Sequence, residues 1–260
     1  MSGSLLPQTF WFRLALACPR VDNMLPAADV DRVLDLPTSC RLPSTTEFEG
    51  GPAWATLSAG WNPRGLGFVV EVGLEPSGRR RTAQVDVDPD GFGGLTPRVQ
   101  FWIDTRDTRD THRASRFCHR FDARFDQGLA ENAAPEAAFE VKIQQRSIAR
   151  ALGEAPTAPS DATRAHGRMH AGGWRLEVFF DARALHGFDP DTNRRLGFNC
   201  AIFDPTRGEQ FLYVDRAFPI GEDPSLWQVL DLIESSMPPT RPQKLEKSST
   251  RLPRSKKVEK

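Results

Sequence analysis

The chain lacks the features that would assign it quickly to a functional class. Its 34 basic and 34 acidic side chains leave no net charge, and its 260 residues include one Tyr, five His and four Cys. No P-loop, GxSxG elbow, HExxH motif or Cys–His pair in a recognisable setting is present. We therefore predict a protein that is not an enzyme and that binds no cofactor and no metal ion.

The charge that is present is unevenly distributed along the chain. Residues 237–260 hold eight Lys or Arg against two Asp or Glu, which leaves +6 in this segment and −6 on the rest. That balance excludes the basic surface of a nucleic-acid binder, so we expect no nucleic acid on the folded body. The segment has almost no large apolar side chains to bury, and we predict a disordered basic tail. It is either a solvated extension or a contact for an acidic partner.

Long hydrophobic runs are also missing. Near the N-terminus no positive charge precedes the apolar stretch, Pro7 lies early in it, and Arg13 interrupts it. We predict neither a secretory signal nor a membrane span, and hence a cytoplasmic protein without membrane contact. The four cysteines are widely separated with no CxxC spacing, which favours buried free thiols over disulfides.

What the sequence does have is apolar residues that alternate with period two, the pattern of half-buried strands. The pattern recurs in "LGFVVEVGL", "RVQFWID", "WRLEVFF" and "RLGFNCAIF", with turn formers such as Asp88-Pro89-Asp90-Gly91 between strands. We predict an all-β fold: a two-sheet antiparallel β-sandwich, jelly-roll-like, with about ten strands and one or two short helices. One domain spans residues 1–236, and the segment rich in Ala, Gly, Pro and Ser at 153–173 is predicted to be a long mobile loop.

Several stretches, in this order, resemble family 9 carbohydrate-binding modules and the related DOMON-like sandwich domains. They are "WATLSAGWNPRGLGFVVEV", "VQFWIDTRDTR", "WRLEVFFDARALHGFDPDTNRRLGFNCAIFDPTRGEQFLYV" and "DPSLWQVLDL", and they cover most of residues 50–234. The resemblance implies a two-sheet β-sandwich of about ten strands. It also implies sugar binding between a pair of tryptophans, with polar residues at the hydroxyls and, in many members, a structural calcium ion.

The repeat "DTRDTRDTHR" at residues 104–113 is the most conspicuous motif. Its aspartates recur every third residue rather than at the alternate positions of a calcium loop, and an Arg directly precedes two of them, so we expect no calcium site. Seven arginines lie between residues 98 and 124, and guanidinium groups bind carboxylates, phosphates or sugar hydroxyls. The motif is either a solvated, self-paired strand end or the edge of a ligand site.

Strand alternation sets the candidate site. Phe101 points into the core, so its neighbour Trp102 lies on the opposite face. An indole beside polar side chains could form a platform for a sugar ring, whereas the alternative is a Trp covered by the 153–173 loop. The predicted ligand-binding residues are Trp102, Asp104, Arg106 and Arg109. Cys118 and His119 point to opposite faces of a strand and cannot both bind one metal ion.

Three functions stay open from the sequence. The first is a non-catalytic binding module for a saccharide or a similar polar ligand. The second is an intracellular protein-interaction or scaffold domain that uses the basic tail. The third is a sandwich-type enzyme, which rests only on the abundance of carboxylates.

Deleting residues 237–260 should leave the melting temperature nearly unchanged, because a segment that buries little apolar surface adds little to stability. Thermal unfolding of the full and truncated chains tests this. Strong protection of the tail amides in hydrogen exchange would contradict it.

Overall fold

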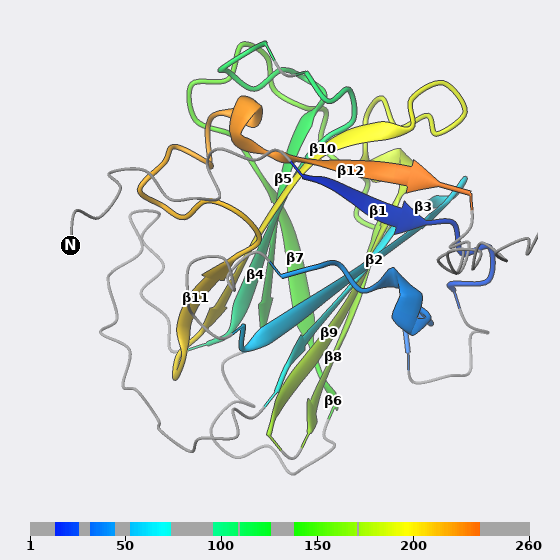
Figure 1. Ribbon diagram of the computed structural model, residues 1–260, viewed down its shortest axis with the longest axis vertical. Helices are drawn as coiled ribbons and strands as arrows, with labels where there is room; N and C mark the ends of the chain where they lie inside the picture. The colour runs from blue at the N-terminus through cyan, green and yellow to red at the C-terminus, as the bar shows by residue number, and fades with distance from the viewer. Residues whose placement is uncertain are drawn as a thin grey trace, which may run out of the picture.

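The computed structural model describes residues 14–25, 32–44, 53–73, 96–108, 110–125, 138–170 and 172–234. The predicted tail at 237–260 lies outside these ranges. Two facing sheets of seven and five strands make up the architecture (Figure 1). The all-β sandwich predicted from the sequence is therefore confirmed.

The first sheet has the order β1-β12-β10-β4-β5-β7, with β11 also paired to β10. Every pairing in it is antiparallel except that of β1 with β12 at the edge, which is parallel. Its strands are β1 (Ala15–Pro19), β4 (Arg98–Asp104), β5 (Cys118–Phe125), β7 (Val141–Arg146), β10 (Arg195–Asp204), β11 (Gly208–Phe211) and β12 (Gln228–Ile233).

The second sheet has the order β2-β3-β9-β8-β6 and is antiparallel throughout. Its strands are β2 (Ala55–Asn62), β3 (Gly65–Val72), β6 (Ala138–Phe139), β8 (Thr163–His170) and β9 (Gly173–Asp181). Short 3₁₀ turns η2 (Thr38–Cys40), η4 (Ala182–Ala184) and η5 (Pro224–Leu226) are the helical elements of the described residues. None of the helices found there is long and apolar enough to span a membrane.

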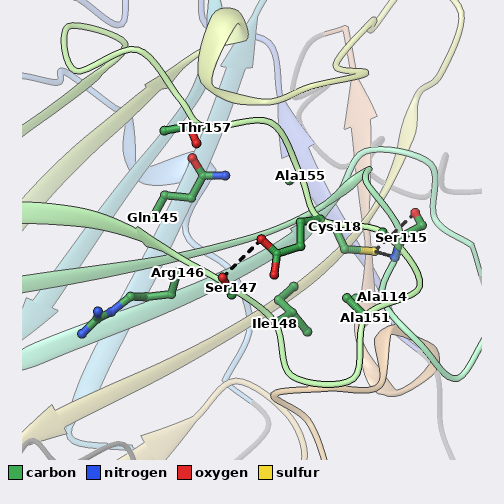
Figure 2. A pocket seen from close by; sticks show the side chains of 12 residues that line it. Ala114, Ser115, Cys118, Gln145, Arg146, Ser147, Ile148, Ala151, Ala155 and Thr157 are labelled. Carbon is green, nitrogen blue, oxygen red and sulfur yellow. Dashed lines mark hydrogen bonds between the residues drawn. The ribbon is translucent and has the colours of Figure 1, made fainter.

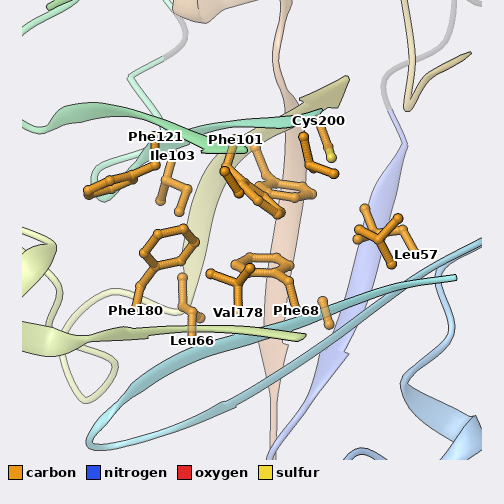
Figure 3. Packing of buried hydrophobic residues seen from close by; sticks show 14 of the residues in the cluster. Leu57, Leu66, Phe68, Phe101, Ile103, Phe121, Val178, Phe180 and Cys200 are labelled. Carbon is orange, nitrogen blue, oxygen red and sulfur yellow. The ribbon is translucent and has the colours of Figure 1, made fainter. Parts of the chain in front are cut away.

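The core between the sheets is built from the inward half of each strand's side chains. Phe101 and Phe121 of the first sheet point toward Phe68 and Phe180 of the second (Figure 3). The ring centroids of Phe121 and Phe180 are 4.5 Å apart, and those of Phe68 and Phe101 are 5.3 Å apart. Offset and tilted aromatic contacts of this kind add to the free energy of burial. The predicted core residues Phe101, Leu176 and Phe198 are each 0% exposed, which confirms the period-two assignment.

A glutamine side chain ties the two sheets together at one end. Gln210 of β11 accepts hydrogen bonds from the backbone N–H groups of Trp54 and Ala55 at 2.9 and 3.0 Å. Its amide nitrogen donates to the Ala55 carbonyl at 2.9 Å. The side chain thus satisfies the backbone at the start of β2, much as a neighbouring strand would.

The expected loop at 153–173 is wrong in part, because β8 occupies Thr163–His170 within it. Composition misled the prediction, since Ala and Gly are poor strand formers. Packing explains why residue 167 is a glycine, because a Cβ atom at this position would lie 1.9 Å from the Phe139 ring. The glycine lets Phe139 of β6 pack over β8, and pairing with β9 on the other side fixes the strand.

All four cysteines, Cys18, Cys40, Cys118 and Cys200, are buried and free, as the spacing predicted. Burial raises the pKa of the Cys40 thiol to about 11, and that of Cys118 to about 12. Thiols held in the protonated form are poor nucleophiles. They pack as small apolar residues.

Phe101→Ala should lower the free energy of unfolding by about 3–5 kcal/mol, because the removed ring leaves a cavity between the sheets. Denaturant titration measures the loss. The matched control is Leu152→Ala, at a side chain that is 63% exposed, which should cost less than about 0.5 kcal/mol. A small loss at Phe101 would contradict the assigned core.

Candidate ligand-binding face

The face of the seven-stranded sheet that points away from the core carries most of the polar chemistry. On β4, Gln100, Trp102 and Asp104 point outward and alternate with the inward Phe101 and Ile103. The strand register sets which outward side chains are neighbours. The outward residues form rows across the strands: Glu209, Phe203, Arg98, Arg124 and Lys142; Phe211, Ala201, Gln100, Asp122 and Gln144; Asn199, Trp102, Arg120 and Arg146.

Trp102 points outward, as alternation predicted, but it is only 3% exposed. It belongs to a second apolar cluster with Tyr213, Val214 and Trp227 from the segment that joins β11 to β12, and with Ile148 after β7. The structure therefore corrects the expectation of an open indole platform. The cover comes mainly from the segment before β12, which the sequence did not identify as a lid over this face.

Asp104 is 1% exposed and shapes the turn that follows β4. Its carboxylate accepts hydrogen bonds from the backbone N–H groups of Arg106 at 2.9 Å and Thr108 at 2.7 Å. Burial raises the pKa of Asp104, although these two bonds oppose the shift. Both oxygens thus serve the turn, where Asp107 adopts a positive φ of 48°.

Arg106 is exposed beyond the end of the strand, with its guanidinium carbon 4.9 Å from the centroid of the Phe117 ring. Arg109 lies outside the described residues. The structure therefore does not bring Trp102, Asp104 and Arg106 together on one open surface. No group of three or more His, Cys, Asp or Glu suited to a metal ion occurs in the part of the chain that is described.

A polar network next to Trp102 is centred on Asp122 of β5, which is 1% exposed. One carboxylate oxygen lies 3.3 Å from the Gln100 amide nitrogen and 3.4 Å from Nε of Arg120. The other lies 3.3 Å from Nη2 of Arg124 and 3.5 Å from Nε of Arg146. A single buried carboxylate thus orients three guanidinium groups from two adjacent strands.

A second carboxylate extends the network toward β11. Arg216 donates to both oxygens of Glu209, at 2.8 and 2.7 Å, and its Nη2 also lies 3.4 Å from the Gln100 side-chain oxygen. Arg98 donates to Glu209 at 3.4 Å. We call the whole set the arginine face: Arg98, Gln100, Arg120, Asp122, Arg124, Arg146, Glu209 and Arg216.

Accessibility rises from the centre of the arginine face to its edges. The side chains of Arg98 and Arg120 are 9% and 13% exposed, whereas those of Arg146 and Arg216 are 32% and 37% exposed. Arg146 lies on β7, and Arg216 lies in the segment after β11. A ligand on this face would therefore meet the two outer arginines first, with Gln100 and Asp122 beneath them.

Two buried donors lie at the border between the apolar cluster and the arginine face. Trp102 Nε1 and Asn199 Nδ2 have no hydrogen-bond acceptor among the described residues, and the two residues are cross-strand partners. Directly opposed residues have Cβ atoms roughly 5 Å apart. One acceptor oxygen bound beside them would stabilise both donors, since an unmade buried hydrogen bond costs about 1–3 kcal/mol.

A cavity of about 110 Å³ lies beside this face, lined by Cys118, Ser147 and the segment up to Thr157 (Figure 2). Ser147 donates to Glu154 at 3.4 Å within it. In Figure 2 the Arg146 side chain extends away from Cys118 and Ser115. The volume is below the roughly 300 Å³ typical of small-molecule sites, so the cavity suits water more than a sugar ring.

A larger groove, of about 720 Å³, runs between the start of β2 and β11. Its lining is mixed, with Leu42 and Leu57 beside Thr56, Arg41 and Phe211. Phe211 also lies at the edge of the arginine face, where the Arg216 guanidinium carbon is 5.9 Å from its ring centroid. The half-buried Phe211 ring therefore adjoins both the groove and the arginine face.

Ser225, His112 and Asp223 come together without forming a catalytic triad. Nδ1 of His112 lies 3.0 Å from both the Ser225 hydroxyl and an Asp223 carboxylate oxygen. A triad needs the serine and the carboxylate on different ring nitrogens. Asp223 also accepts from the backbone N–H of Ser225 at 2.9 Å, so the group acts as the cap of η5.

Two features of the sequence point to the arginine face, although no local pattern connects them. One is the group of seven arginines between residues 98 and 124, and the other is the alternation in "RVQFWID", which puts Gln100 on the same side of the strand as Trp102. The pairing of Gln100 with Asp122 follows from strand register, which sequence reasoning did not assign. Arg146 and Arg216 come from distant parts of the chain, and no local pattern marks them.

No family model matches the chain, and no curated protein matches it. Among solved structures, a family 9 carbohydrate-binding module from Caldicellulosiruptor kristjanssonii in complex with cellotriose is similar over 72% of this chain and 79% of that chain, with 12% identity and a TM-score of 0.43. The same kind of module in complex with glucose gives 11% identity and a TM-score of 0.43, over 70% of this chain and 78% of that chain. A TM-score of 0.43 does not establish a common fold. The sandwich architecture follows from the chain's own strand pairing, and the DOMON-like resemblance stays a prediction.

His119 lies on the inward side of β5, opposite Cys118, as alternation predicted. It is 0% exposed, and its ring is stacked on that of Phe121 with the ring centroids 6.1 Å apart. Its Nε2 lies 3.2 Å from the His186 carbonyl oxygen. Nε2 therefore carries the proton that it donates to the carbonyl. Burial lowers the pKa of His119 to about 4 from its ordinary 6.5, because the charged form is poorly solvated there.

The unfolded chain binds a proton at this residue near pH 6.5, whereas the folded protein binds it only near pH 4. The stability that the neutral ring confers is therefore present above pH 6.5 and is lost as the pH falls toward 4, by roughly 3 kcal/mol in total. Denaturant titrations of wild type and His119→Gln should show that the free energy of unfolding falls less in the variant than in wild type between pH 6.5 and pH 4. The difference should be about the amount given above for His119. The carboxylates change the stability of both proteins equally over this pH range. If the free energy of unfolding had the same pH dependence in both proteins, the lowered pKa of His119 would be wrong.

Proposed function

We propose that this protein is a non-catalytic binding module that takes a saccharide or a similar polar ligand on the arginine face. The observation that carries the proposal is the buried Asp122 carboxylate, which holds Gln100 and three guanidinium groups in fixed positions. The predicted site around Trp102 is thereby moved along the same sheet face, from the covered indole to the polar network beside it.

The mixture of donors and acceptors suits hydroxyl groups. A hydroxyl both donates and accepts, and the arginine face offers guanidinium donors next to the carboxylates of Asp122 and Glu209 and the amide of Gln100. Specific binding of small ligands relies on a few well-placed polar groups of this kind. A purely apolar ligand would leave these groups without water or partners, at a cost in free energy.

The side chains of the arginine face are held in fixed positions, which suits ligand recognition better than a mobile, solvated surface would. Gln100 and Asp122 stand on neighbouring central strands, and their register is fixed by the β4–β5 and β4–β10 pairings. Groups held on strands and by surrounding hydrogen bonds need little ordering when a ligand binds. The half-buried Phe211 ring at the edge of the face adds an apolar surface on which C–H groups of a sugar could pack.

The proposal includes that the protein binds its ligand without catalysing a reaction. The Cys118 thiol beside this face is held protonated by a pKa of about 12, and Ser225 and Asp223 share one nitrogen of His112. Neither arrangement supplies an activated nucleophile. The arginine face holds oriented hydrogen-bond donors and two carboxylates paired with arginines. Groups of this kind can bind a polar ligand.

A glycan array followed by calorimetry tests the proposal. Arg146→Ala and Arg216→Ala should each weaken binding of the selected saccharide at least about tenfold, because each removes a charged donor from opposite sides of Gln100 and Asp122. Both side chains are partly exposed, so the melting temperature should change little. Arg183→Ala on η4, where the side chain is 54% exposed and paired with Asp161 and Asp181, is the matched control and should bind like wild type.

If wild type binds no saccharide in the array or in calorimetry, the proposed function is wrong. If a saccharide binds with equal affinity to wild type and to both variants, the function stands and the assigned face is wrong.

A further inference from the structure

We propose that the protein has a second ligand site, for an oxyanion such as a sulfate, phosphate or carboxylate group, where the chain passes from β4 to β5. The site consists of Arg106, Arg116 and His186, which surround the ring of Phe117. It shares no residue with the arginine face and does not rest on the proposed function. Arg106 comes from the repeat "DTRDTRDTHR" and is one of the predicted ligand-binding residues.

The half-buried Phe117 ring is the centre of this site. The guanidinium carbons of Arg106 and Arg116 lie 4.9 and 5.0 Å from its centroid. The imidazole ring of His186 is stacked on it, with the centroids 5.2 Å apart and the ring planes 6° from parallel. Arg106, Arg116 and His186 are all exposed, so three side chains with N–H groups lie around one aromatic ring and are open to solvent.

The two guanidinium groups are not taken up by acceptors of the protein itself. Within the described ranges, neither Arg106 nor Arg116 forms a side-chain hydrogen bond or a direct ion pair. Asp189 accepts hydrogen bonds from Thr192, which lower the pKa of its carboxyl group, and the charge of Arg106 adds a smaller effect in the same direction. A guanidinium group that packs its face on an aromatic ring keeps its N–H groups free in the plane. These donors can therefore bind a ligand.

A buried threonine connects the three segments that carry the site. The Thr105 hydroxyl donates to the His186 carbonyl at 2.8 Å, and its backbone N–H donates to the Phe117 carbonyl at 3.0 Å. Thr105 is 0% exposed and directly precedes Arg106. His119 also contacts the His186 carbonyl through Nε2, at 3.2 Å. The backbone from which each side chain extends is thus fixed before a ligand binds, which lowers the cost of ordering the site.

Gly187 allows the stacked pair of rings to form. Its φ of 87° lies in the left-handed region, and a Cβ atom there would lie 2.6 Å from Cδ1 of Phe117 and 2.7 Å from Oγ1 of Thr105. Glycine adopts this conformation readily and leaves room for the ring, whereas another side chain would displace it. The adjacent His186 ring is thereby brought over Phe117.

The donors of this site favour an oxyanion over a hydroxyl group. Arginine side chains only donate, and an imidazole carries an N–H donor in both its neutral and its charged form. Both guanidinium carbons lie within 5.0 Å of one centroid, so a single anion with several oxygens can accept from both. Such charge-assisted hydrogen bonds are about twice as strong as neutral ones. The arginine face, by contrast, also offers carboxylate and amide acceptors, which suit hydroxyl groups.

The experiment titrates the protein with sodium sulfate, sodium phosphate and sodium acetate at constant ionic strength, with sodium chloride as the reference salt. Binding is followed through the NMR signals of the arginine Nε–H groups, because sulfate and phosphate also stabilise folded proteins without occupying a site. Sulfate or phosphate should give saturable shifts at Arg106 and Arg116 that chloride does not give. Comparison with acetate tells whether the site prefers a tetrahedral anion or a carboxylate.

Three variants assign the binding to these side chains. Arg106→Gln and Arg116→Gln should each weaken sulfate binding at least about fivefold, measured at the remaining arginine. His186→Phe keeps a ring on Phe117 but removes its N–H groups, and should weaken binding about twofold. All three changes are at exposed positions and should leave the fold intact.

Arg164→Gln is the matched control. Arg164 is an exposed arginine on β8 of the other sheet, and its guanidinium carbon likewise lies near an aromatic ring, 5.2 Å from the centroid of Phe179. This variant should bind sulfate like wild type.

Shifts that rise linearly with sulfate at all exposed arginines, or that persist unchanged when Arg106 or Arg116 is replaced, would overturn the inference. An equal loss in Arg164→Gln would also overturn it, since the anion would then respond to charge in general. Saccharide binding on the arginine face should be unaffected by Arg106→Gln, and its loss would contradict a separate site. If no saccharide binds at all, the proposed function fails and the anion titration still decides this inference.

Discussion

Strand alternation is the constraint on which the rest of this structure depends. Each strand places successive side chains on opposite faces, so burying one half between the sheets fixes where the other half points. On β4 the inward Phe101 meets Phe68 and Phe180 across the core, and its neighbours Gln100 and Trp102 must then lie on the outer face. The aromatic core therefore holds the polar network in place without touching it.

The outer face of the seven-stranded sheet has an apolar part, which is covered, and a charged part, which keeps contact with water. Around Trp102 the side chains are apolar, and the segment before β12 covers them, which removes the indole from water. Around Asp122 the side chains are charged, and covering them completely would leave ionic groups without solvent or full pairing. Arginines lie over the sheet there instead, since their long apolar stems cover surface while the guanidinium groups keep contact with water.

A buried carboxylate among arginines is costly unless it is well paired. Asp122 receives hydrogen bonds or ion pairs from Gln100, Arg120, Arg124 and Arg146, which compensates the loss of hydration. The same contacts limit the motion of the guanidinium groups. Fixed donors are what a binding surface needs, so the structural role of Asp122 and the proposed recognition role of the arginines follow from one arrangement.

The sequence by itself determined the class of fold and the sides of its strands. Period two in "RVQFWID" and "WRLEVFF" correctly placed Phe101 and Leu176 in the core, because alternation is a local property of an extended chain. It did not identify β8, whose Ala165 and Gly167 are poor strand formers and are held by pairing with β9 and packing against Phe139. Only the tertiary structure decided which outward residues form the arginine face. Register brought Gln100 opposite Asp122, a distant segment covered Trp102, and Arg146 and Arg216 joined the network from β7 and from beyond β11. Such contacts between distant parts of the chain leave no local pattern in the sequence, because they depend on how the strands pair.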